Sequence, residues 1–173
     1  MFCLVKVLNT EFFYLPMAEL NIKEEYNKLK EKYKLPDFED INLEFEFIAI
    51  DKKGIISRQI RRRMNDKVVF FCNIIERILY PNPQAIPLAQ ESKFLDDKKD
   101  NLFRLYKKLM SYERRSLDLD VRSSKEKDDI DFIKDLLNDW KEIKGNISEA
   151  TVKLKEFWKI KEEKKEKGEV YFG

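Results

Sequence analysis

The side chains of this chain that could do acid–base chemistry are its carboxylates, because its 173 residues include no histidine. Without histidine there are no Ser–His or Cys–His nucleophile pairs, and no haem, zinc or di-iron site with a histidine ligand. Two acidic groups have suggestive spacing. Glu44 and Glu46 flank an aromatic residue, and Asp131, Asp135 and Asp139 recur at every fourth position, which would place them on one helix face.

Paired carboxylates can act as general acid and base, or hold a hard cation. In a chain with 33 acidic residues, however, such spacings arise freely, and Lys134 and Lys141 are close enough to pair with the aspartates. No glycine-rich phosphate loop or nucleophile elbow occurs, and only 4 glycines are present. We therefore expect no catalytic residue, no metal site, no cofactor and no small-molecule substrate, and predict that the protein is not an enzyme.

The most distinctive basic feature is an arginine-rich run in a chain otherwise rich in lysine. Residues 52–77 carry eight basic and two acidic side chains, whereas residues 17–51 carry five basic and ten acidic ones. Arginine presents a planar fork that suits bidentate contacts with phosphate or carboxylate. On a helix, this run could follow a nucleic-acid backbone. The candidate contact residues are Arg58, Arg61, Arg62, Arg63 and Lys67.

The same arginines have a second interpretation, in which they pair internally with the acidic segment 37–46 and fix the fold. Self-association through patches of opposite charge is a third use of them. A second basic cluster adds Arg104, Lys108 and Arg115 to the candidate contact residues. Tyr112, which lies among them, could stack a nucleotide base.

Apolar residues that recur every three or four positions predict a chain of helices. Pro36, Pro81 and Gly145 should end three of them, and Asp37 should cap another. The proline-rich stretch 81–93 should hold one helical turn. The predicted fold class is all-α, an antiparallel helical bundle of four to five principal helices. The predicted helices cover residues 19–34, 38–45, 55–80, 96–117, 123–145 and 146 to about 160.

The chain length fits one domain, which we expect over residues 17–167. Residues 1–16 are predicted to be an N-terminal extension. Either they lie upstream of a natural start at Met17, or residues 2–8 form a short strand. They lack the pattern of a targeting signal. Residues 168–173 form an aromatic tail, in which Tyr171 and Phe172 either fray or dock on the bundle or on a partner.

Two cysteines are too few for a disulfide scaffold or a cysteine-ligated zinc site. Cys72 lies in an apolar run, which predicts a buried thiol. No apolar stretch approaches the roughly 20 residues of a membrane span. These features predict a cytoplasmic protein with reduced thiols and no membrane contact.

Several short strings resemble a family of small, uncharacterised helical proteins of archaea. They are residues 34–42 (KLPDFEDIN), 60–64 (IRRRM), 105–110 (LYKKLM) and 171–173 (YFG). The resemblance covers residues 17–173. It implies an archaeal cytosol and a helical fold, and it brings no catalytic residue with it.

We therefore expect a non-catalytic helical protein that binds RNA, or a ribonucleoprotein such as the ribosome, through the arginine-rich helix face. The alternative is a protein–protein interaction or self-associating module, for example a homodimer, with no nucleic-acid role. The RNA-binding and protein-interaction hypotheses differ in whether the guanidinium groups of residues 58–63 face solvent or pair with internal carboxylates.

Overall fold

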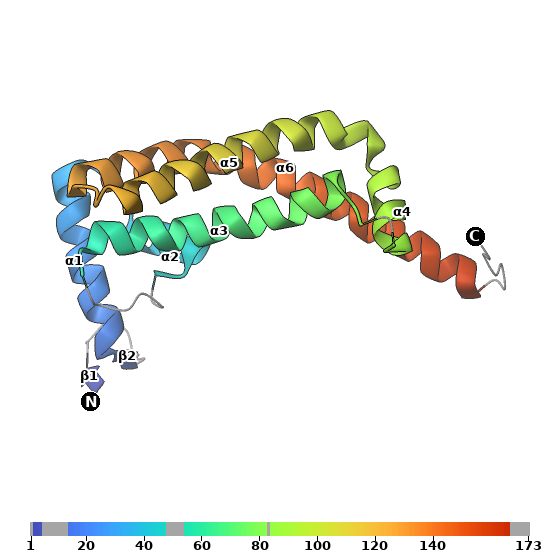
Figure 1. Cartoon of the computed structure of the whole chain (residues 1–173). Coiled ribbons are helices and arrows are strands. Elements are labelled where there is room, and N and C mark those ends of the chain that lie inside the picture. The colour runs from blue at the N-terminus through green and yellow to red at the C-terminus, as the bar shows by residue number, and fades with distance from the viewer. Residues whose placement is uncertain (1, 5–13, 48–53, 83, 167–173) are drawn as a thin grey trace. The chain divides into compact units, whose positions relative to one another are not determined.

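The computed structural model describes residues 2–4, 14–47, 54–82 and 84–166. In these ranges the regular structure is helical apart from two three-residue strands, β1 (Phe2–Leu4) and β2 (Tyr14–Pro16), which pair antiparallel. The remaining elements are six α-helices and one 3₁₀ turn (Figure 1). The predicted all-α fold class is confirmed. A short strand at Phe2–Leu4 agrees with one of the two interpretations of the first sixteen residues.

The helices follow the predicted apolar spacing. Pro36 and Pro81 lie just beyond the ends of two of them, as expected because the residue before a proline avoids helical angles. In the proline-rich stretch, where the sequence predicts one helical turn, the structure has a nine-residue helix. Pro87 lies in the first turn of this helix, where the missing N–H of proline costs no hydrogen bond. The elements are α1 (Met17–Tyr33), α2 (Phe38–Phe45), α3 (Ile56–Leu79), α4 (Ile86–Phe94), η2 (Asp96–Lys98), α5 (Lys99–Val121) and α6 (Glu126–Glu166).

The prediction that Gly145 ends a helix is wrong, because α6 continues through it. A glycine inside an exposed helix costs only about 1 kcal/mol relative to alanine. The apolar side of the helix also continues across it, since Ile143 and Ala150, two turns apart, are both buried. The sequence predicts that a new helix begins at Asn146 or Ser148, but both lie inside α6, and the Asn146 side chain donates to the carbonyl of Glu142 at 2.9 Å.

Asp37 occupies the predicted N-cap position of α2, but its side chain makes no capping hydrogen bond. It pairs with Lys30 of α1 instead. An exposed ion pair therefore joins the start of α2 to α1, and α2 begins at the predicted residue without the predicted side-chain cap.

The chain divides into two compact units, and each consists of two separate segments. Unit 1 combines Met1–Lys67 with Arg115–Asp135, and unit 2 combines Val68–Arg114 with Leu136–Gly173. The helices α3, α5 and α6 each run from one unit into the other. The expected single domain over residues 17–167 stays a prediction.

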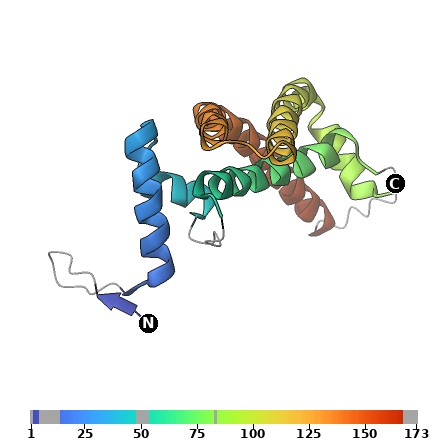
Figure 2. The same ribbon diagram turned by 60° about the vertical axis from the view of Figure 1, so that its left-hand side comes forward.

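In unit 1, α1 runs crosswise to the start of α3 (Figure 2). The aromatic core of this unit is formed by rings of α1, of α2 and of Phe47, which follows α2. The ring of Tyr26 in α1 packs against Phe38 and Phe47 at centroid distances of 5.5 and 6.2 Å, and Phe45 stacks on Phe47 at 6.0 Å. All four rings are buried. The Tyr26 hydroxyl donates to the carbonyl of Pro36 at 2.9 Å, so its one polar group is satisfied.

Unit 2 is packed around Trp140 of α6, whose ring stacks on Phe71 of α3 at a centroid distance of 5.8 Å. Cys72 is buried next to this pair, as predicted, and its burial, with a smaller effect from Glu113 and Glu76, raises the pKa of its thiol to about 11. The surrounding buried side chains include Ile75, Ile78, Leu102, Leu105, Leu109, Leu136 and Ile143.

The helices α5 and α6 run antiparallel within each unit, which confirms the prediction for the helices after the proline-rich connection. Residue numbers fall along α6 as they rise along α5. The hydrogen bonds that show this are Lys108 to Glu142 and Tyr112 to Asp139 in unit 2, and Arg115 to Asp135 in unit 1.

Candidate functional site

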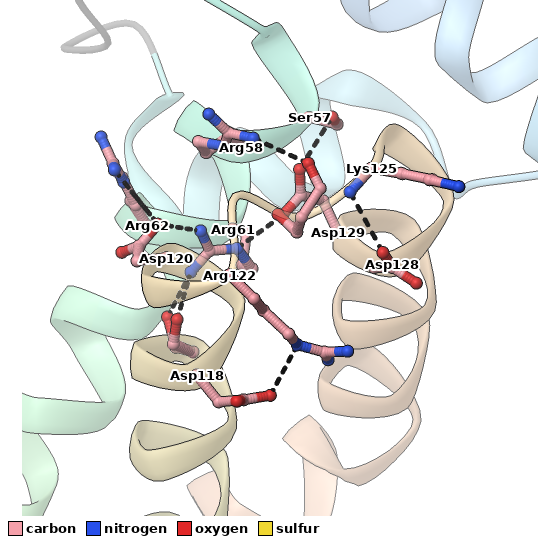
Figure 3. A network of polar contacts seen from close by, with 12 residues as sticks. Ser57, Arg58, Arg61, Arg62, Asp118, Asp120, Arg122, Lys125, Asp128 and Asp129 are labelled. Atoms are coloured by element: carbon pink, nitrogen blue, oxygen red, sulfur yellow. Dashed lines mark hydrogen bonds and ion pairs between the residues drawn. The ribbon is translucent and has the colours of Figure 1, made fainter.

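Arg61 of α3 is the centre of a polar network inside unit 1 (Figure 3). Its side chain is 0% exposed. Its Nε donates to Asp129 at 2.7 Å, its Nη1 donates to the carbonyl and hydroxyl oxygens of Ser116 at 3.0 and 2.5 Å, and its Nη2 donates to Asp120. Every nitrogen of the guanidinium therefore has an acceptor, which is what a charge removed from water requires.

Asp129, in the first turn of α6, is the buried carboxylate that matches Arg61. Its Oδ1 also accepts a hydrogen bond from the hydroxyl of Ser124 at 2.8 Å, and its Oδ2 accepts one from Ser57 at 3.3 Å. All of these side chains are buried. A negative charge at this end of a helix also interacts favourably with the helix dipole. The pair therefore links α3 to the start of α6.

Arg58 holds the turn between α5 and α6. Its Nη2 donates to the carbonyl of Ser124 at 2.7 Å. The preceding residue, Ser123, has φ +53°, in the left-handed region that a side chain enters only at a cost. Arg58 Nε is buried without a hydrogen-bond partner in the described part of the chain. Arg58 is thus committed to this turn rather than presented to solvent.

Arg62 and Arg63 are more exposed, and each also meets an internal acceptor. The Arg62 side chain is 50% exposed, and its Nε lies 3.1 Å from Asp120. Arg63 donates to the carbonyl of Phe45 and to the carboxylate of Glu46, both at 3.1 Å. Internal pairing with the acidic segment is therefore observed for Arg63, whereas the other paired arginines of the run bind carboxylates of α5 and α6.

The structure places Arg61 in the core and not on the surface where the sequence hypothesis puts it. Arg61 directly follows Ile60 and precedes Met64 by three positions, and both of these residues are fully buried. Its side chain therefore projects into the same arc of α3 as the apolar residues. Lys67 is partly exposed and makes no ion pair with any residue in the described ranges.

Three residues of the second basic cluster bind carboxylates of α6. In unit 2, Lys108 Nζ lies 3.0 Å from Asp139, and the Tyr112 hydroxyl donates to the same carboxylate at 2.7 Å. In unit 1, Arg115 donates to Asp135 at 2.6 Å. Tyr112 is only 9% exposed, so its ring is not available to stack a base.

These contacts engage two of the three aspartates whose spacing suggested chemistry. Burial would raise the pKa of Asp139, but the hydrogen bonds from Tyr112 and Lys108 outweigh it and lower the pKa. Asp135 is held by its arginine partner, while Asp131 is exposed. Within the described residues, no group of three or more acidic or cysteine side chains could hold a metal ion.

Basic side chains without a carboxylate partner gather instead on the outward side of α5 in unit 2. The exposed residues of this stretch, which we name the α5 outer face, are Asp100, Asn101, Phe103, Arg104, Lys107, Ser111 and Arg114. Three of the seven are basic and one, Asp100, is acidic. Only Arg104 belongs to the contact residues predicted from the sequence.

Contacts within the α5 outer face are weak and local. Lys107 Nζ lies 4.4 Å from the ring centroid of Phe103, and Arg104 donates to the side chain of Asn101 at 2.5 Å. Arg114 makes no ion pair with the described part of the chain. A sequence signal for this face exists, because the twelve residues that begin at Asn101 include no acidic side chain.

The arginine network predicts that stability depends on acid pH. Burial would raise the pKa of Asp120, but hydrogen bonds from Arg61 and Arg62 outweigh it and lower the pKa. A carboxyl with a lowered folded-state pKa adds stability above its unfolded pKa of about 4, and this stability is lost as pH falls through the folded value. We expect urea titrations to show a falling free energy of unfolding below about pH 4. Asp120→Asn should flatten part of that fall, and an identical pH profile in the variant would contradict the prediction.

Two predictions concern parts of the chain beyond the network. Tyr171 and Phe172, the tail residues expected to dock, lie outside the described residues. In the described ranges, no helix combines the length and the apolar character that crossing a membrane demands.

Comparison of the chain with protein-family models, with curated proteins and with solved structures found no match.

Proposed function

We propose that this protein is a non-catalytic, cytoplasmic binding protein that associates with RNA or a ribonucleoprotein through the α5 outer face. The observation that carries the proposal is the composition of this face, with three cations, one aromatic ring and a single carboxylate. Cations bind a nucleic-acid backbone by replacing its counterions, and aromatic rings bind bases by stacking.

The arginine-rich start of α3 supports the proposal less well, because Arg61, Arg62 and Arg63 already have carboxylate partners. A phosphate would compete with Asp120 for Arg62 and with Glu46 for Arg63, and the displaced carboxylate would repel it. Arg61 is inaccessible. We therefore assign this run a structural role in unit 1 and assign the contact with RNA to α5.

The other long helices of unit 2 expose balanced charge. Between residues 138 and 162 of α6, the exposed side chains include four basic and four acidic ones. The exposed part of α3 in unit 2 carries Glu76 and Arg77. A surface with equal numbers of cations and carboxylates produces little net potential, whereas three cations with one carboxylate keep a positive potential that attracts a polyanion.

Charge reversal tests the proposal with a matched control. The test variant carries Arg104→Glu, Lys107→Glu and Arg114→Glu. The control variant carries the same change at three exposed lysines of α6, namely Lys141→Glu, Lys155→Glu and Lys159→Glu. Binding of a fluorescently labelled, mixed-sequence RNA to the full chain would be measured by anisotropy at several salt concentrations.

Three phosphate contacts to a single strand give a slope of about −2 for the logarithm of the binding constant against that of salt concentration. We expect this slope for the wild type and a loss of affinity of about 100-fold or more for the α5 variant at 0.1 M salt. The α6 variant should stay within about 5-fold of the wild type. Absence of wild-type binding at low salt, or equal losses in both variants, would overturn the proposal.

A second candidate, protein–protein interaction, is favoured by an aromatic cluster on α4 and α6 of unit 2. Phe94 packs on Phe157 at 5.5 Å, and Phe157 packs edge-to-face on Trp158 at 5.3 Å. Trp158 is 41% and Ile160 45% exposed, and exposed apolar clusters often mark protein contacts. Sedimentation over a wide concentration range tests self-association, which requires a mass that rises with concentration and falls in Trp158→Ala.

A further inference from the structure

Phe103 is an aromatic side chain that lies on a basic surface rather than in the core. It is 38% exposed on the α5 outer face, while its neighbours Leu102 and Leu105 are buried. Arg104 follows it directly in the sequence, and Lys107 Nζ lies 4.4 Å from the centre of its ring. The core of unit 2 therefore does not account for an aromatic residue at this position.

Two other exposed aromatic residues of unit 2 have one cation and one carboxylate beside them. Trp158 donates its indole N–H to the carboxylate of Glu91 at 2.6 Å, and Lys161 Nζ lies 5.1 Å from the centre of its ring. Phe70 of α3, which is 57% exposed, lies one helical turn after Asp66 and Lys67. Phe103 has two cations beside it, Arg104 and Lys107, and one carboxylate, Asp100, one helical turn before it.

We infer that the α5 outer face binds single-stranded RNA, with one base stacked on Phe103 and phosphates held by Arg104, Lys107 and Arg114. The inference rests on the proposed function and adds the class of strand. In an A-form duplex the base faces are covered by neighbouring bases, and a protein meets only the backbone and groove edges. In a single strand each base offers a face for stacking.

Lys107 exchanges its partner when a base binds. In the free protein its ammonium group lies over the ring that the base would occupy. A stacked base displaces the ammonium group, which then lies within reach of the adjoining phosphate and keeps its charge. Between Phe103 and Arg114, α5 rises by about 16 Å, so the face holds a few nucleotides at most.

The experiment compares a labelled oligouridylate with a labelled RNA duplex of equal length, using the full chain and anisotropy. Phe103→Leu keeps an apolar side chain but removes the ring, and Phe103→Trp restores a ring. Phe70→Leu is the matched control, since it makes the same change at an exposed phenylalanine of α3. Lys107→Met removes one cation and keeps a similar stem.

We expect the wild type to bind the single strand about 10-fold more tightly than the duplex. Phe103→Leu should weaken binding of the single strand about 10-fold without changing the salt slope, and Phe103→Trp should restore it. Lys107→Met should reduce the slope by about 0.7. Phe70→Leu should bind like the wild type.

Each opposite result has a distinct meaning. Equal wild-type affinity for single strand and duplex, or an unchanged affinity of Phe103→Leu, would overturn this inference while the proposed function stands. Displacement of the RNA by an oligoglutamate of equal charge would assign the face to acidic peptides and overturn it as well. Absence of wild-type binding to either RNA at low salt would overturn the proposed function together with the inference.

Discussion

Replacing Asp129 with alanine is expected to lower the free energy of unfolding by about 3–5 kcal/mol, measured by urea titration of the full chain at neutral pH. Asp129 is fully buried, and its carboxylate accepts hydrogen bonds from Arg61, Ser57 and Ser124. Its removal leaves a buried guanidinium whose Nε has lost its acceptor, while Asp120 remains as the only carboxylate shown bound to it. An incompletely paired charge inside a protein is strongly destabilising.

Two further variants distinguish the effect of leaving a buried charge unpaired from the effect of losing an ion pair. Asp118→Ala removes an ion pair with Arg122 that lies at 2.8 Å but is exposed, and should cost less than about 1 kcal/mol. In the double variant Arg61→Met with Asp129→Ala, the buried charge is absent, so the loss should be smaller than the sum of the two single losses. A cost for Asp129→Ala no greater than that for Asp118→Ala would contradict the prediction.

Replacing Trp140 with alanine is expected to cost about 3–5 kcal/mol, because it removes the largest ring from the core of unit 2. Trp140 is 6% exposed and stacks on Phe71, so the substitution loses both the apolar burial and the stacking and leaves a cavity. Urea titration would measure the loss, and fluorescence of the remaining tryptophan, Trp158, would follow the transition.

Trp158→Ala is the matched control for this prediction. It removes the same side chain from a site that is 41% exposed, where less apolar surface is lost on unfolding. We expect less than half the cost of Trp140→Ala. Equal costs for the two variants would show that the Phe71–Trp140 contact is not the main contributor to the core of unit 2.

Helix positions followed from the sequence wherever apolar spacing and prolines agreed. The interval 38–45 matches α2 at both ends, and α3 lies within one residue of its predicted limits. At Gly145, the glycine predicted a helix end whereas the apolar spacing predicted a continuous helix. The helix continues because one exposed glycine destabilises it far less than the burial of Ile143 and Ala150 stabilises it. Local residue preferences alone could not decide between them.

The partners of charged residues could not be predicted in the same way. Arg61 pairs with Asp120 and Asp129, which lie about sixty residues further along the chain, so only the folded arrangement brings them together. On α5, Lys107 and Lys108 are adjacent in sequence but about 100° apart around the helix. Lys108 meets carboxylates of α6, while Lys107 faces outward. Without the position of α6, the sequence does not distinguish a paired lysine from an unpaired one.

The division of three helices between the two units has a consequence for how this chain can be divided or inherited. A cut at any of the three boundaries, in α3, α5 or α6, would interrupt a continuous helix, and no single cut would free either unit whole. Neither unit can therefore be exchanged between genes as one contiguous cassette. A contiguous stretch that holds one unit whole also includes a segment of the other, since it must run from residue 1 to 135 for unit 1 or from residue 68 to 173 for unit 2.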